Sequence, residues 1–151
     1  MIFRETTLAG VTLVLIQRHE DSRGSFGRTF CRDEFAAAGL PVDFVQASAS
    51  VSRHAGTLRG MHFQRAPCAE GKLVRCVRGA IHDVVADLRP DSPSFKRWQA
   101  FELREEGDAT LYIPPGCAHG FQTTADDTEI LYQMTERFAP EAATEIGRAH
   151  V

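Results

Sequence analysis

Short runs of β-branched and aromatic residues, each closed by turn residues, constrain most strongly what this chain can fold into. Such runs are typical of strands. Their repetition, with turns rich in Gly, Pro and Asp between them, favours an all-β sandwich or barrel over an α/β fold. The strand-like runs are residues 11–16, 44–46, 72–77, 80–88, 101–103, 110–113 and 129–134, and the turn signals are residues 78–79, 89–93, 106–108, 114–116 and 125–127.

Helical patterns are scarce. Residues 32–39 are amphipathic with helical spacing, and Gly39 and Pro41 would end that helix. We therefore expect one or two short peripheral helices. The chain has 151 residues, which can bury one sizeable core, and no internal repeat or linker divides it. One domain, residues 1–151, is the prediction.

The composition argues against several classes of function. A formal net charge of -3 and the absence of a basic run argue against a nucleic-acid partner, although a small anionic ligand fits. Residues 11–16 are too short an apolar run to cross a membrane, and no signal sequence precedes them, so we expect a cytoplasmic protein without a membrane partner. The four cysteines lack metal-ligand spacing and are expected to be free thiols: Cys31, Cys68, Cys76 and Cys117.

Asp83 interrupts the apolar run 80–88. In a strand it shares a face with Val85, whereas His82 faces the other side. A carboxylate that points into a barrel must be paired, because an isolated buried charge is very costly. Asp83 is therefore a candidate for orienting a cationic site residue such as Lys72. An exposed or structural aspartate is an equally weighted alternative.

The densest cluster of unusual side chains is residues 56–64, which contain Arg59 and His62. In an extended chain these two side chains face opposite sides, so both reach one ligand only if Gly60 introduces a bend or bulge. The alternative is a hydrogen-bonded core histidine, which is the more frequent role of a histidine among apolar neighbours.

A second cluster, residues 112–121, has two prolines and a glycine before His119. Small neighbours on both sides of His119 would let a ligand approach, which predicts a ligand-facing loop; a surface turn is the alternative. Lys72 and Tyr132 would not stand out alone, since a lysine at a strand end is usually solvated and a strand tyrosine usually lies in the core. No HxH or HxxE spacing joins the histidines, so a metal site is the less favoured alternative.

Together, these segments resemble the dTDP-4-dehydrorhamnose 3,5-epimerase family of nucleotide-sugar enzymes. Their order and spacing agree over most of the chain. Each motif is modest, but the ordered set is specific. The matching segments are residues 21–24, Phe26, 44–46, 56–64, 71–75, 83–89, 92–93, Trp98, 111–116, 118–121, Tyr132 and 139–141.

This resemblance implies a cupin-type jelly roll that works without metal or cofactor on a nucleotide-diphosphate sugar. It also implies a homodimer in which an N-terminal segment of one subunit contributes to its partner's site. His62 would be the general base, Tyr132 the general acid on the opposite face of the sugar, and Lys72 a cation near the 4-keto oxygen. The residue types suit the chemistry, because inversion next to a ketone needs a separate base and acid and a stabilised enolate.

The remaining roles implied by the resemblance concern binding. Arg59 and His119 would bind the diphosphate and sugar. Arg23 would hold the nucleotide across the dimer. Phe138 would stack on the base, with Gln46 close to the ligand.

The sequence departs from the family at three places. Near Phe26, Arg28 stands where a glutamate is common, and Ser48 stands where an asparagine is common. Phe26, Arg28 and Ser48 remain candidate ligand contacts. The identity of the nucleotide base, thymidine or another, stays open. The expected domain also lacks the family's C-terminal segment, one aspartate of which pairs with the catalytic histidine.

That third departure leaves alternatives open. Asp83, Glu141 or Glu145 are candidates to replace the aspartate beside His62. A catalytically impaired nucleotide-sugar-binding paralogue is the main alternative function, and a metal-dependent cupin is the less favoured one.

Overall fold

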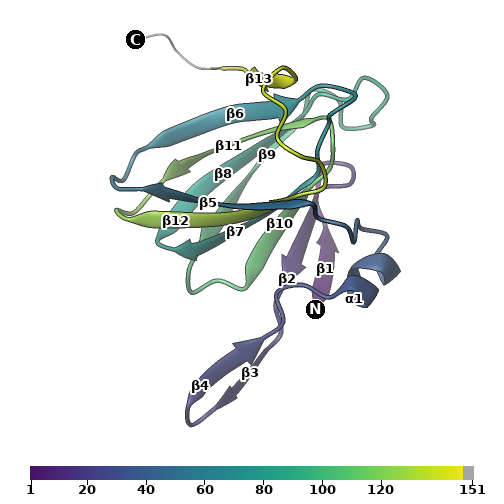
Figure 1. Cartoon of the computed structure of the whole chain (residues 1–151). Helices are drawn as coiled ribbons and strands as arrows, with labels where there is room; N and C mark the ends of the chain where they lie inside the picture. Colours follow the sequence, from purple (N-terminus) through teal and green to yellow (C-terminus); the bar gives the residue numbers. More distant parts are fainter. Residues whose placement is uncertain (148–151) are drawn as a thin grey trace.

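Two antiparallel sheets lie face to face in the computed structural model, which describes residues 1–147 (Figure 1). The last residues of the expected domain, 148–151, lie outside the described part. The larger sheet has the strand order β1 (Ile2–Glu5), β2 (Thr12–Leu15), β10 (Ala109–Ile113), β7 (Lys72–Arg78), β12 (Thr128–Met134) and β5 (Gln46–Ser52). The smaller sheet has the order β13 (Ala143–Glu145), β6 (Leu58–Gln64), β11 (Cys117–Thr123), β8 (Ala80–Asp87) and β9 (Trp98–Arg104).

The hydrophobic core fills the space between the two sheets. Alternation along β8 places Ile81, Asp83 and Val85 inside, fully buried, while His82 is exposed. The predicted all-β sandwich of jelly-roll type is therefore confirmed. Two expectations about its elements were wrong: Phe44 lies before β5 rather than in a strand, and the segment that follows the turn at 114–116 is the strand β11 rather than a loop.

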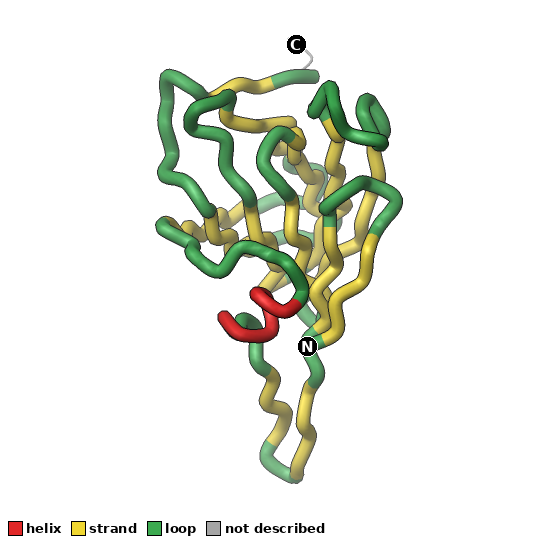
Figure 2. The backbone as a smooth tube through the Cα atoms, turned by 90° about the vertical axis from the view of Figure 1, so that its right-hand side faces the viewer, coloured by secondary structure: helices red, strands yellow, loops and turns green. Residues whose placement is uncertain are grey.

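A two-stranded hairpin and one helix lie outside the sandwich. The hairpin consists of β3 (Arg18–Asp21) and β4 (Gly24–Gly27) and projects away from the two sheets (Figures 1 and 2). The helix α1 (Arg32–Ala37) confirms the one predicted helix, and its buried Phe35 packs in a second apolar cluster with Val14, Leu73 and Tyr112. Within residues 1–147 no helix is long and apolar enough to cross a membrane.

Candidate active site

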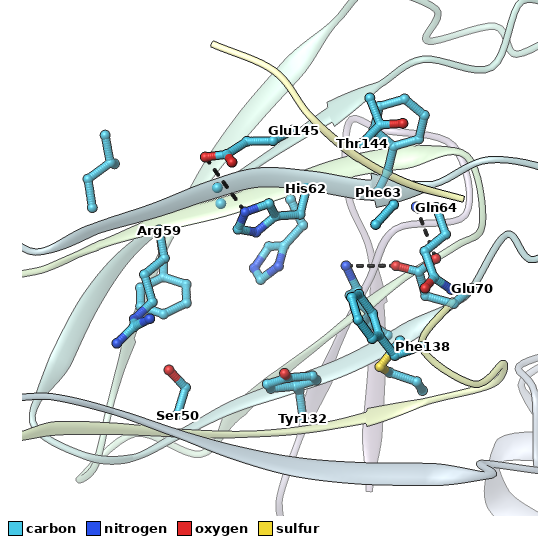
Figure 3. Close-up of a pocket in the computed structure, with 18 residues that line it drawn as sticks. Ser50, Arg59, His62, Phe63, Gln64, Glu70, Tyr132, Phe138, Thr144 and Glu145 are labelled. Carbon is cyan, nitrogen blue, oxygen red and sulfur yellow. Dashed lines mark hydrogen bonds and ion pairs between the residues drawn. The ribbon is translucent and has the colours of Figure 1, made fainter. Parts of the chain in front are cut away.

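A cavity of about 920 Å³ opens between the two sheets (Figure 3). Its size is in the upper range of ligand sites in proteins. Both sheets contribute to its walls, so residues far apart in the sequence meet in it. Six of the predicted site residues line it: Arg59, His62, Lys72, His119, Tyr132 and Phe138.

A bulge in β6 turns Arg59 and His62 toward this one cavity. In the pairing of β6 with β11, His62 lies opposite His119 and Arg59 lies opposite Phe121, so β6 has one residue more than its partner between these points. Gly60 sits in the bulge with a φ of +102°. A Cβ there would approach the His119 carbonyl oxygen to 2.7 Å. The predicted role of Gly60 is confirmed.

His62 and Tyr132 lie on opposite walls of the cavity (Figure 3). His62 comes from β6 in the smaller sheet, and its side chain is 53% exposed. Tyr132 comes from β12 in the larger sheet, where it pairs with Val74 while Met134 pairs with Lys72. Paired residues of neighbouring strands share a face, so Tyr132 and Lys72 project from the same wall.

Glu145 is the carboxylate that the structure places beside His62. The two residues are directly opposite in the pairing of β13 with β6, and Glu145 Oε1 lies 3.8 Å from His62 Nε2. Of the three replacements considered from the sequence, Asp83 pairs with another histidine and Glu141 lies outside the residues that line the cavity. A carboxylate beside an imidazole orients the ring and stabilises its protonated form.

Asp83 orients His119, not Lys72 as the sequence suggested. Its Oδ2 atom lies 2.7 Å from His119 Nε2, and the carboxylate is fully buried. The cause is the register of β8 and β11, in which Asp83 faces Phe121 and His119 is two residues away on the same face. The predicted burial of Asp83 is correct, and the alternative of an exposed aspartate is wrong.

Lys72 has a different acidic partner, Glu70. Its Nζ lies 2.8 Å from Glu70 Oε1, and both side chains line the cavity. Glu70 is a cavity residue that was not predicted from the sequence. The available signal was its position two residues before Lys72 across a glycine, because residues i and i+2 of an extended chain point to the same side.

Phe138 stands at the cavity with its backbone held from both sheets. Its N–H donates to Gln46 Oε1 at 3.0 Å, and the next N–H, of Ala139, donates to Gln64 Oε1 at 2.6 Å. Phe138 as a whole residue remains 57% exposed. Gln46 therefore supports a cavity residue within the subunit.

Five predicted ligand contacts are not among the residues that line this cavity within one subunit: Gln46, Arg23, Phe26, Arg28 and Ser48. Arg23 and Phe26 lie on the projecting hairpin, where Arg23 pairs with Asp21 and Phe26 is 72% exposed. Arg28 pairs with Glu34, and Ser48 lines a smaller cavity of about 570 Å³. Within residues 1–147, no three His, Cys, Asp or Glu side chains are grouped so that they could hold a metal ion.

The fold and site define a cupin-type sandwich with an imidazole, a phenol and an ammonium group around one cavity. A model of the dTDP-4-dehydrorhamnose 3,5-epimerase family matches residues 5–149. The enzyme of that name from Sinorhizobium fredii is 42% identical over 141 residues, which cover 93% of this chain and 72% of the relative. The chain belongs to the dTDP-4-dehydrorhamnose 3,5-epimerase family.

Solved structures of the same family agree with this assignment. The Bacillus anthracis enzyme, crystallised with TDP and PPi, superposes with a TM-score of 0.93 at 35% identity, covering 96% of this chain and 83% of that one. The Legionella pneumophila enzyme, in complex with dTDP-4-keto-L-rhamnose, has a TM-score of 0.89 at 31% identity, covering 96% and 77%.

Proposed function

We propose that this protein inverts carbon 3, carbon 5 or both in a nucleotide-diphospho-4-keto-6-deoxyhexose, as a step of deoxysugar biosynthesis. The observation that carries the proposal is the placement of His62 and Tyr132 on opposite walls of one cavity. Family membership supports the same reaction. The four cysteines are free thiols in the structure, which is consistent with action in the cytoplasm.

The proposed reaction proceeds by proton transfer. His62 removes the hydrogen next to the ketone, and the electron pair of the C–H bond forms an enolate whose negative oxygen lies near the Lys72 ammonium group. Tyr132 then donates its phenolic proton to the opposite face of the same carbon, which inverts the centre. Each positioned transfer group contributes roughly a hundredfold to ten-thousandfold in rate, and a preorganised cation lowers the energy of the enolate.

The substrate we propose is thymidine-linked. Relatives have been crystallised with TDP and with dTDP-4-keto-L-rhamnose. In this chain, Arg59 and the His119–Asp83 pair supply the polar groups for the diphosphate and sugar, and Phe138 offers an exposed ring on which a base can stack.

We further propose a homodimer in which the hairpin of one subunit completes the cavity of the other. The hairpin projects from the sandwich and carries the exposed Phe26 and Arg23, which have no role in the cavity of their own subunit. Such a dimer would cover three exposed apolar residues: Val51 in β5, Leu131 in β12, and Val45, which directly precedes β5.

Deuterium wash-in tests the proposed reaction. In heavy water, the protein should introduce deuterium at the carbons flanking the ketone of a dTDP-4-keto-6-deoxyhexose and form the epimer, whereas heat-denatured protein should do neither. Ligand-dependent thermal stabilisation without any exchange would instead identify a non-catalytic nucleotide-sugar-binding protein.

A further inference from the structure

Lys72, the cation of the proposed reaction, is one half of a buried ion pair. Its side chain is 13% exposed and that of Glu70 is 3% exposed, and their charged atoms are 2.8 Å apart. Figure 3 shows Glu70 close to Gln64 at one end of the cavity. A carboxylate so deeply buried is retained at a high desolvation cost, which makes its placement beside a reactive cation informative.

Glu70 is itself fixed by the smaller sheet. Its second oxygen, Oε2, accepts the Gln64 backbone N–H at 3.1 Å. The Gln64 side chain donates to the carbonyl oxygens of Cys68 and Arg137, at 2.8 and 3.1 Å. Glu70 therefore links Lys72, on the larger sheet, to a rigid point on the smaller one.

The neighbouring backbone adds to this rigidity. The Gly71 N–H donates to Thr135 Oγ1 at 2.7 Å, and the Thr135 N–H donates to the Gly71 carbonyl at 2.9 Å. The residue between Glu70 and Lys72 is thus tied to the end of β12. Both members of the ion pair have little freedom to move along the cavity wall.

We propose that Glu70 is a positioning residue for this reaction: it holds the Lys72 ammonium group where the enolate oxygen forms. A lysine side chain is flexible, and a cation stabilises a developing charge best when it is already oriented. An ammonium group has three N–H donors, so the bond to Glu70 leaves two for the ligand. This inference rests on the proposed function and adds a residue that acts through Lys72.

A double-mutant cycle tests the inference. In Glu70→Gln, the negative charge is lost and an NH2 group replaces one carboxylate oxygen, so the side chain presents a donor to either the Gln64 N–H or the ammonium group and cannot keep both contacts in their present geometry. The wash-in rate constant at saturating substrate should fall about tenfold, with KM within about threefold. In a Lys72→Met background, where the cation is gone, the same change should alter the rate by less than about twofold.

Two further variants separate positioning from general structural damage. Glu70→Asp keeps the charge but is one methylene shorter, so its rate should lie between those of wild type and Glu70→Gln, again only when Lys72 is present. Glu102→Gln removes the same carboxylate from a more exposed contact, with His82 at 2.5 Å on the smaller sheet and outside the cavity, and should leave the rate unchanged.

The possible results are distinct. Equal losses from Glu70→Gln in both backgrounds, or a wild-type rate for Glu70→Gln, would overturn the positioning role while leaving the epimerase proposal intact. No wash-in by the wild-type protein would overturn the proposed function, and this inference with it. A loss of rate from Glu70→Gln that occurs only when Lys72 is present supports both the epimerase proposal and the positioning role of Glu70.

Discussion

The two tyrosines of this chain occupy very different environments. Tyr132 faces the cavity, whereas Tyr112 is 4% exposed and packs in the apolar cluster around Phe35. Burial raises the pKa of Tyr112 to about 12, so its phenol is not suited to proton transfer near neutral pH. The difference makes Tyr112 a natural control for the proposed role of Tyr132.

Replacing Tyr132 by Phe should separate exchange from inversion. His62 can still remove a proton and return deuterium to the same face, so wash-in should persist, whereas epimer formation should fall by roughly a hundredfold or more. NMR of the product in heavy water measures both quantities. Tyr112→Phe should match wild type in both. A parallel loss of wash-in and inversion in Tyr132→Phe would contradict the assignment of separate base and acid.

For single residues, the sequence predicts membership of the site better than it predicts which side chains will be hydrogen-bonded or ion-paired with each other. Arg59, His62, Lys72, His119, Tyr132 and Phe138 were all assigned from the family resemblance and all line one cavity. The partner of Asp83 was assigned wrongly, because that choice depends on the register between β8 and β11, which the alternation within one strand does not contain.

Among the elements, the β6 bulge has the largest effect on the site. It turns Arg59 and His62 to one cavity, and it depends on a glycine packed against the backbone of β11. The sequence could predict this feature, because the odd spacing of two polar residues around a glycine requires a bulge if both face one ligand. It could not predict β11 as a strand, since its turn residues and small side chains suggested a loop.

Gly60→Ala should damage both stability and activity. A Cβ at this position would lie 2.7 Å from the Gly120 Cα and the His119 carbonyl oxygen, so β6 would have to move and carry His62 with it. We expect the free energy of unfolding to fall by about 3 kcal/mol or more and wash-in to fall at least tenfold.

Gly56→Ala is the matched control for this change. Gly56 also has a positive φ, +81°, but nothing lies within 4 Å of an added Cβ. It should cost only about 1–2 kcal/mol for the left-handed backbone and should spare activity. Denaturant unfolding and wash-in measure both effects. Equal losses in the two variants would show that close packing of the bulge contributes nothing.

In the proposed homodimer, each active site is made from the cavity of one subunit and the hairpin of the other. An Arg23→Ala/Phe26→Ala hairpin variant and a His62→Ala variant should each have low activity. A heterodimer of the two, purified by two different affinity tags, has one site with an intact cavity and an intact hairpin. It should recover about half of the wild-type rate. A heterodimer no more active than the two parents would exclude a hairpin that acts on the partner's cavity.

The clamp on Phe138 fixes the width of the cavity before any ligand arrives. Gln46 belongs to one sheet and Gln64 to the other, and both hold the same short stretch of backbone. Spreading the two layers at this end would break at least one of these hydrogen bonds, whereas Phe138 itself is 57% exposed. The ligand therefore enters a cavity whose width at the Phe138 end is already set. Little of its binding free energy is lost to ordering the protein.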